Sequence, residues 1–93
     1  MKNILLSIEK KALRKKAYSL KPVVMIGQNG LTDAVLDEID VSLNSHELIK
    51  IRIRGANKNE RYNICLKIKQ KLKAQLVYQI GFIKVFYRSK AEN

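Results

Sequence analysis

The chain has 93 residues, of which 46% are hydrophobic and 29% charged, so we expect one small globular domain over residues 1–93 rather than a disordered protein. Its 19 Lys and Arg side chains against eight Asp and Glu give a net charge of +11, which favours a polyanionic partner, nucleic acid before an acidic membrane surface. A single cysteine excludes an internal disulfide, no apolar run approaches the ~18 residues of a membrane span, and no signal peptide is recognisable, so we expect a cytoplasmic protein.

The first predicted element is a helix over residues 8–19, with Ser7 as a suitable N-cap and Pro22 ending the segment. Helical spacing separates its side chains into an apolar side and a basic side. Lys16 breaks this pattern because it falls near the middle of the apolar side, so either its methylene stem lies along the core or the helix docks loosely. The apolar side comprises Leu5, Ala12, Leu13 and Leu20, and the basic side comprises Lys10, Lys11, Arg14 and Lys21.

Residues 23–26, VVMI, predict a short buried strand, because the run is too short and too rich in β-branched side chains for a helix. From Thr32 the apolar residues recur with helical spacing, which predicts a second helix over residues 32–45. Thr32 can cap this helix, and a carboxylate in its first turn suits the helix dipole. We expect its acidic flank to be solvated surface; this flank comprises Asp33, Asp37 and Asp40.

The stretch ELIKIRIR, residues 47–54, alternates between apolar and basic side chains. This alternation predicts a strand with one buried face and one strongly basic face. The buried face comprises Ile49, Ile51 and Ile53, and the basic face comprises Lys50, Arg52 and Arg54.

Gly55 ends that strand, and either Asn57 or Asn59 can cap a third helix. We expect Cys65 and the lone His46 to have structural roles, Cys65 in the core and His46 near the C-terminus of the second helix. The apolar stripe of the third helix comprises Ile64, Cys65, Ile68 and Leu72.

Two further runs, QLVYQI and IKVFYR, predict strands over residues 75–80 and 83–88, joined by a hairpin-length connection of Gly81 and Phe82. The element order is therefore α-β-α-β-α-β-β. Strands separated by helices imply parallel crossovers, and the closing hairpin adds antiparallel pairing. The expected fold is α/β, with one mixed four-stranded sheet packed with helices.

The loop between the first strand and the second helix has the sequence Gly27-Gln28-Asn29-Gly30. Asn-Gly often marks a hairpin, but here a helical pattern follows, so we reject that interpretation. The glycines serve either a tight turn alone or a backbone clamp, in which a phosphate chain approaches the main chain beside a helix N-terminus. KH domains use a Gly-x-x-Gly loop for single-stranded RNA, although a lone loop of this kind is a weak signal.

In this context, LKPVVMIGQNGLTDAVLDEIDVSLNSHELIKIRI resembles the signature block of the CRM domain, named for chloroplast RNA splicing and ribosome maturation. The bacterial single-domain members of that family are the YhbY-type proteins. The closing stretch IGFIKVFYR resembles the last strands of the family, which end in Tyr-Arg. The likeness extends from about Ser7 to Arg88.

The resemblance implies a fold similar to the C-terminal domain of translation initiation factor three. It also implies RNA binding and, in bacteria, association with precursors of the large ribosomal subunit. We therefore expect a non-enzymatic RNA-binding protein, a monomer that needs no cofactor or metal. Its expected RNA-binding residues are Gly27, Gln28, Asn29, Gly30, Lys10, Arg14, Lys21, Lys50, Arg52 and Arg54.

Three other classes of function fit the sequence less well. An RNA-acting enzyme needs an acid-base group or a metal cluster, and no such constellation is apparent. A membrane-surface helix fits residues 8–19 only in part, because the apolar side is needed for the core. General nucleic-acid binding without a ribosomal role is the nearest alternative, although no DNA-recognition helix stands out. We expect Tyr18 and Tyr62 to be packing or rim residues rather than base-stacking platforms.

Overall fold

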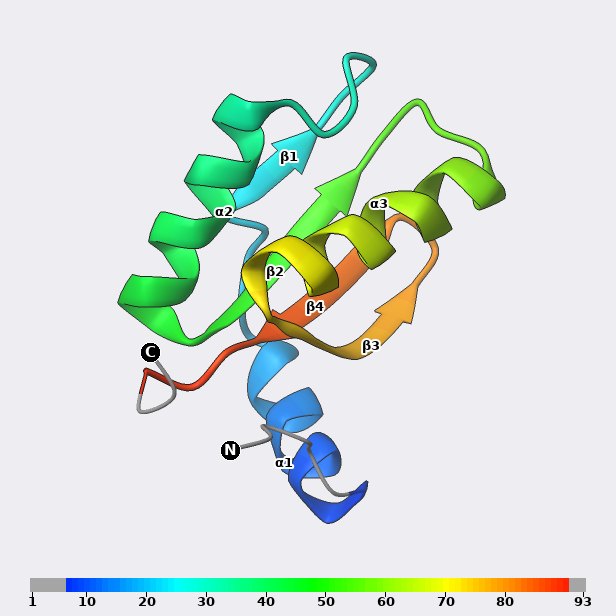
Figure 1. Ribbon diagram of the computed structural model, residues 1–93. Helices are drawn as coiled ribbons and strands as arrows, with labels where there is room; N and C mark the ends of the chain where they lie inside the picture. The colour runs from blue at the N-terminus through cyan, green and yellow to red at the C-terminus, as the bar shows by residue number, and fades with distance from the viewer. Residues whose placement is uncertain (1–6, 91–93) are drawn as a thin grey trace.

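The computed structural model describes residues 7–90 and contains three helices and four strands in the predicted order (Figure 1). The helix nearest the N-terminus ends two residues earlier than predicted, because its last residues tighten into turns in which Leu20 N–H bonds the carbonyl of Ala17 at 3.0 Å. The elements are α1 (Ser7–Ala17), β1 (Val24–Ile26), α2 (Asp33–His46), β2 (Leu48–Ile53), α3 (Lys58–Leu72), β3 (Gln75–Ile80) and β4 (Ile83–Tyr87).

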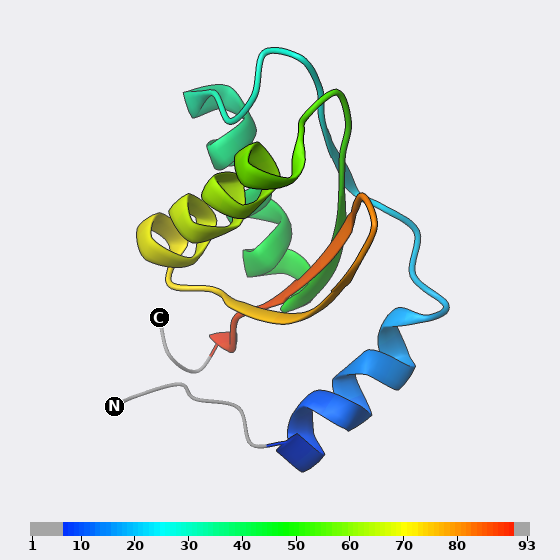
Figure 2. The same cartoon turned by 90° about the vertical axis from the view of Figure 1, so that its right-hand side faces the viewer.

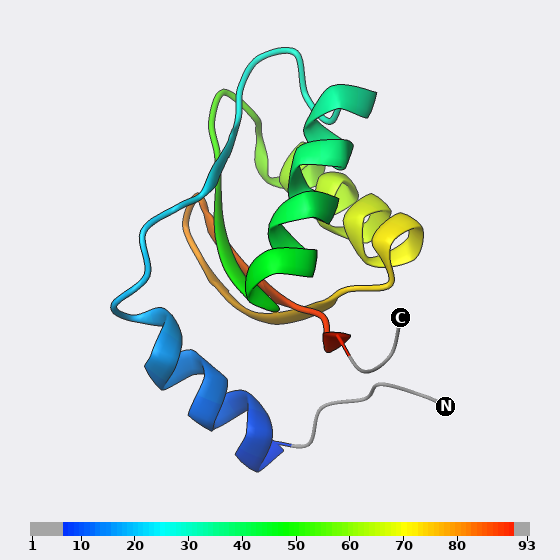
Figure 3. The same cartoon turned by 90° about the vertical axis from the view of Figure 1, so that its left-hand side faces the viewer.

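The four strands form one mixed sheet in the order β1-β2-β4-β3. β1 runs parallel to β2, whereas β4 is antiparallel to both of its neighbours, β2 and β3. The predicted α/β fold with a mixed four-stranded sheet is therefore confirmed. α2 and α3 cover one face of this sheet and α1 lies against the other (Figures 2 and 3).

The main core lies between the sheet and the α2–α3 layer. The predicted alternation in β2 is confirmed, because Ile49, Ile51 and Ile53 are at most 1% exposed and turn toward these helices. Burying an isoleucine side chain contributes about 2 kcal/mol, so three in one strand fix its register firmly. The same core contains Val24, Ile26, Ile39, Leu43, Cys65, Ile68, Ala74 and Phe86.

A second, smaller core lies on the opposite face, under α1. Ala17 is completely buried there against Val77 and Val85, with Leu13 and Leu20 packed around them. Ala12, which the spacing assigns to the apolar side, is instead exposed, because only a narrow stripe of α1 meets the sheet. Leu5, also assigned to that side, lies outside the described residues.

Two of the predicted caps are present. Thr32 caps α2 through its hydroxyl, which accepts from the N–H of Val35 at 3.2 Å. Asn57, rather than Asn59, caps α3, and it exchanges two 2.8 Å hydrogen bonds with Glu60 in a capping box. Ser7 is itself the first described residue of α1, so the prediction that it precedes the helix as N-cap was wrong.

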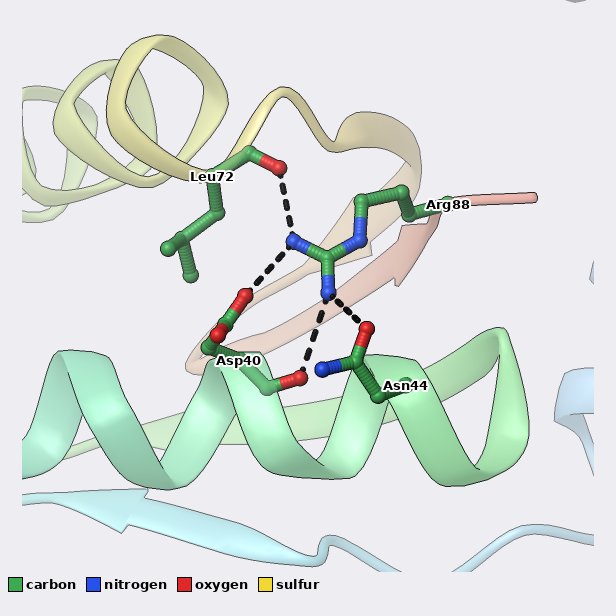
Figure 4. A network of polar contacts seen from close by, with 4 residues as sticks. All are labelled: Asp40, Asn44, Leu72 and Arg88. Atoms are coloured by element: carbon green, nitrogen blue, oxygen red, sulfur yellow. Dashed lines mark hydrogen bonds and ion pairs between the residues drawn. The ribbon is translucent and has the colours of Figure 1, made fainter. Parts of the chain in front are cut away.

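The acidic flank of α2 is only partly the solvated surface that we predicted. Asp33 and Asp37 are exposed, but Asp40 forms an ion pair with Arg88 just beyond β4. Figure 4 shows Arg88 between α2 and the end of α3, where its guanidinium also bonds the carbonyl oxygen of Leu72 and the side chain of Asn44. This arginine connects three elements at the end of the sheet opposite the glycine loop.

Candidate nucleic-acid interface

The glycine loop, residues 27–30, leaves the end of β1 and projects beyond the strands (Figure 1). It closes as a tight turn in which the N–H of Gly30 donates to the carbonyl of Gly27 at 3.0 Å. Gln28 and Asn29 are exposed at its tip, and α2 begins three residues after Gly30. The loop therefore presents both main chain and amide side chains beside a helix N-terminus, where anions are favoured.

The two glycines differ in what the fold demands of them. Gly30 has a φ of +73°, a left-handed conformation that costs other residues about 1 kcal/mol or more. Gly27 has no positive φ, and a Cβ added to it would meet nothing within 4 Å. The turn thus explains a glycine at position 30 but leaves Gly27 without a structural reason in the isolated chain.

The connection from β2 to α3 supports the glycine loop from the side. The N–H of Arg54 donates to the carbonyl of Ile26 at 2.8 Å. A Cβ on Gly55 would lie 3.4 Å from the Cγ of Gln28, so Gly55 keeps space for this side chain. A surface hollow of about 450 Å³ lies between the two segments, and it is lined by Met25, Gly27, Gln28, Arg54 and Gly55.

The basic row of β2, formed by Lys50, Arg52 and Arg54, leads away from that hollow along the α1 side of the sheet. Arg52 and Arg54 are exposed, and Lys50 is half-buried. In the sheet register Arg52 lies between Met25 of β1 and Ile83 of β4. Met25 is 53% exposed, and its sulfur lies 3.9 Å from the guanidinium of Arg54. This part of the sheet therefore offers cations and apolar surface together.

The predicted basic residues of the first helix lie on the same side of the sheet as this row, because α1 packs on that face (Figure 2). Lys21 and Lys50 border one cavity. Arg14 lies over the ring of Tyr78, 5.0 Å from its centroid, and Tyr18 meets the same ring edge-on. Lys10 is exposed one turn before Arg14, on the same side of α1. Arg14 is thus partly engaged in packing α1 onto β3.

A second basic cluster was missed at the sequence level. Lys84 is only 4% exposed, and its ammonium donates to Gln79 Oε1 at 2.6 Å and to the carbonyl of Gly81 at 3.2 Å. Burial lowers the pKa of Lys84. Arg61 lies over the ring of Phe82, 4.8 Å from its centroid, and lines a hollow together with Lys84. In β4, Lys84 lies two residues before Phe86 and therefore on the same face of the sheet, toward α2 and α3. This alternation was the one signal in the sequence that Lys84 would be buried.

The side chains best suited to catalysis are not assembled into a site. His46 is exposed at the end of α2, and Cys65 is 5% exposed in the core, as expected. Burial raises the pKa of the Cys65 thiol, which makes it a weak nucleophile. Within residues 7–90, no three His, Cys, Asp or Glu side chains are grouped so that they could hold a metal ion. None of the helices described there has the length and apolar character to cross a membrane.

Comparisons with known proteins agree on one family. The family model described as the CRS1 / YhbY (CRM) domain matches residues 5–88. An RNA-binding protein of Haemophilus influenzae is 45% identical over 84 residues, which are 90% of this chain and 85% of that protein. A probable RNA-binding protein of Pseudomonas aeruginosa is 35% identical, covering 86% of this chain and 77% of that protein. The solution structure of a Staphylococcus aureus protein, described as a candidate RNA binder, superposes with a TM-score of 0.80 at 28% identity, covering 92% and 90% of the two chains.

Proposed function

The chain belongs to the CRS1 / YhbY (CRM) domain family, and from that premise we propose that it is a non-enzymatic RNA-binding protein that acts on ribosomal RNA in precursors of the large ribosomal subunit. Its relatives in Haemophilus influenzae and Pseudomonas aeruginosa are named for RNA binding. The ribosomal target follows from the resemblance of the sequence to the YhbY-type members.

The observation that carries the proposal is the position of Gly27. A small side chain at this position would meet no neighbour within 4 Å. Because the residue is glycine, the main chain is accessible beside Arg54 and the N-terminus of α2. A sugar-phosphate chain gains from each of these features, because it can approach the backbone closely and meet both N–H groups and a guanidinium. The Gly27–Gly30 loop is therefore proposed as a clamp on the RNA backbone.

The basic row of β2 extends this clamp. Phosphate contacts carry most of the affinity of a protein with this net charge, and they fix position without reading sequence. Met25, exposed between these cations, adds an apolar surface for a base or sugar. The proposed mechanism is thus binding of a structured RNA through its backbone, with few contacts that depend on base identity.

Gradient sedimentation of a cell lysate tests the ribosomal role. We expect the protein to co-sediment with precursors of the large subunit at low salt and to leave these fractions after ribonuclease treatment. A general nucleic-acid binder would instead spread over all RNA-containing fractions in proportion to their RNA. A protein found only at the top of the gradient at low salt would contradict both versions of the proposal.

A further inference from the structure

A cavity of about 480 Å³ lies between α1 and the β2 side of the sheet, away from the glycine loop. Its floor is apolar and half-buried. Leu13 and Leu20 come from α1 and the segment after it, and Leu48 and Tyr87 come from β2 and β4. The volume lies within the range of small-molecule sites, and such sites combine an apolar floor with a few polar groups.

Three of the polar side chains at this cavity are cationic. Lys16, Lys21 and Lys50 border it, and no carboxylate pairs with any of the three among the described residues. Among the described residues that line the cavity the acidic one is Glu47, whose carboxylate accepts the main-chain N–H of Lys90 at 2.7 Å. His46 also lines the cavity. Lys16, which interrupts the apolar side of its helix, thus lines a cavity.

An apolar floor with a cationic rim matches a nucleotide whose base is unpaired. The base, including a face against Tyr87, would replace water on the floor, and its flanking phosphates would meet the lysines. A base within a duplex could not enter, because its faces are already stacked. We propose that this cavity binds the base of one unpaired RNA nucleotide, with Lys16, Lys21 and Lys50 on the adjacent phosphates; this inference rests on the proposed RNA-binding function.

The basic row of β2 runs from the cavity toward the proposed clamp. Lys50 belongs both to the rim of the cavity and to the basic row that ends at Arg54 beside Gln28. Arg54 lies four positions after Lys50, just beyond the end of β2, a span of about 13 Å at the usual rise per residue of a strand. One RNA strand can therefore cross the sheet from the glycine loop to the cavity with cations beneath it throughout.

Paired lysine variants on α1 test the inference. Lys16→Met removes the charge at the cavity but keeps the length of the side chain and its helix propensity. Lys15→Met makes the same change on an adjacent exposed residue that does not line the cavity. With a short single-stranded RNA oligonucleotide as the probe, we expect Lys16→Met to weaken binding about tenfold and Lys15→Met about twofold or less. Equal losses would overturn the cavity site and leave general electrostatic binding in place.

Methyl NMR of the wild-type protein supplies a second measurement. We expect the signals of Leu13 and Leu48 to shift with the intact oligonucleotide and to stay in place with an abasic oligonucleotide of the same length. Shifts that are the same with both probes would overturn base insertion. If the lysine pair differed only on anionic phospholipid vesicles, the cavity would be a lipid site and the inference would be wrong. The proposed function is tested separately. If the wild-type protein binds the oligonucleotide and substitutions of Gln28 and Asn29 weaken that binding, the proposed function stands even when the cavity site is wrong.

Discussion

Arg88 and Asp40 are 48 residues apart in the chain, and their side chains meet at 2.8 Å. The arginine is only 8% exposed, whereas the carboxylate is 44% exposed. The same guanidinium bonds the main-chain carbonyls of Asp40 and Leu72 and the amide oxygen of Asn44 (Figure 4). Arg88, the buried partner, therefore connects α2 and the end of α3 to the segment that follows β4.

Replacing Arg88 should destabilise the fold more than replacing its partner. Arg88→Lys retains the charge but cannot reach four acceptors with a planar fork, so we expect a loss of about 2 kcal/mol in the free energy of unfolding. Asp40→Asn keeps an acceptor oxygen in the same place and leaves the other three bonds, so its loss should stay below about 1 kcal/mol. Urea denaturation of both variants measures the difference, and equal losses would show that the ion pair rather than the network stabilises the fold.

The two glycines of the loop should separate folding from RNA binding. Gly30→Ala forces a side chain into a left-handed conformation and should cost about 1 kcal/mol of stability. Gly27→Ala meets no neighbour and should melt like the wild type, but it should bind RNA more weakly because its methyl group occupies the approach to the main chain. Thermal melting and oligonucleotide binding are measured on both variants. Unchanged RNA binding by folded Gly27→Ala would argue that the loop is only a turn.

Negative charge at the tip of the glycine loop should weaken RNA binding without destabilising the fold. Gln28→Asp with Asn29→Asp places two carboxylates beside the proposed phosphate path, and we expect RNA binding to fall at least about tenfold, or ~1.4 kcal/mol. The fold should survive, because Thr32 still caps α2 and carboxylates near a helix N-terminus suit its dipole. Gln28→Ser with Asn29→Ser at the same positions provides a neutral control. A wild-type affinity of the double aspartate variant would remove the loop from the interface.

The basic row of β2 should determine much of the salt dependence. Changing Lys50, Arg52 and Arg54 to Gln removes three proposed phosphate contacts, so the slope of log affinity against log salt should flatten by about two units. A matched control carries the same three charge changes at three exposed positions of α3, Lys67, Lys69 and Lys71. We expect little change of slope in this control. Identical slopes for the two triple variants would mean that net charge, and not this face, controls binding.

Cys65 should make stability depend on pH in the alkaline range. Its pKa is raised above the ordinary 9.0 chiefly by burial, while the nearby Lys84 and Lys69 lower it. The folded state therefore holds the thiol proton more tightly than the unfolded state, so the stabilisation is fully present below 9.0 and declines as the pH rises through the folded pKa. Cys65→Ala removes this component, so its deficit in unfolding free energy should shrink as the pH rises. A deficit that stays constant would show no coupling to the thiol.

Local features made most of the fold predictable. The alternation of Ile49, Ile51 and Ile53 marks a strand because neighbouring side chains point to opposite faces. The end of the following loop is set by Asn57 and Glu60, three residues apart, which satisfy two N–H groups of one helix terminus. Each of these signals depends on residues a few positions apart, so the sequence contains it directly.

The candidate site was predictable only in part, since its assembly depends on distant contacts. The sequence predicts that Arg14 binds RNA. It does not show that this side chain lies over the ring of Tyr78, or on which face of the sheet α1 packs. The burial of Lys84 and Arg88 was not predicted, because only the folded chain supplies the acceptors that allow it. Lys16 interrupts the apolar side of its helix, and the sequence does not show the cavity that this side chain lines in the folded chain.

The position of β4 has a consequence for the synthesis of the protein. Of the four described strands, the last to leave the ribosome lies in the interior of the sheet, between β2 and β3. Until it emerges, β2 and β3 have no partner on their inner edges, and the core lacks Phe86. A nascent chain that has released only the residues up to β3 therefore lacks the strand that joins β2 to β3. The sheet can therefore close only after residues 83–88 have been released, when Phe86 completes the core and Arg88 can join α2 to the end of α3.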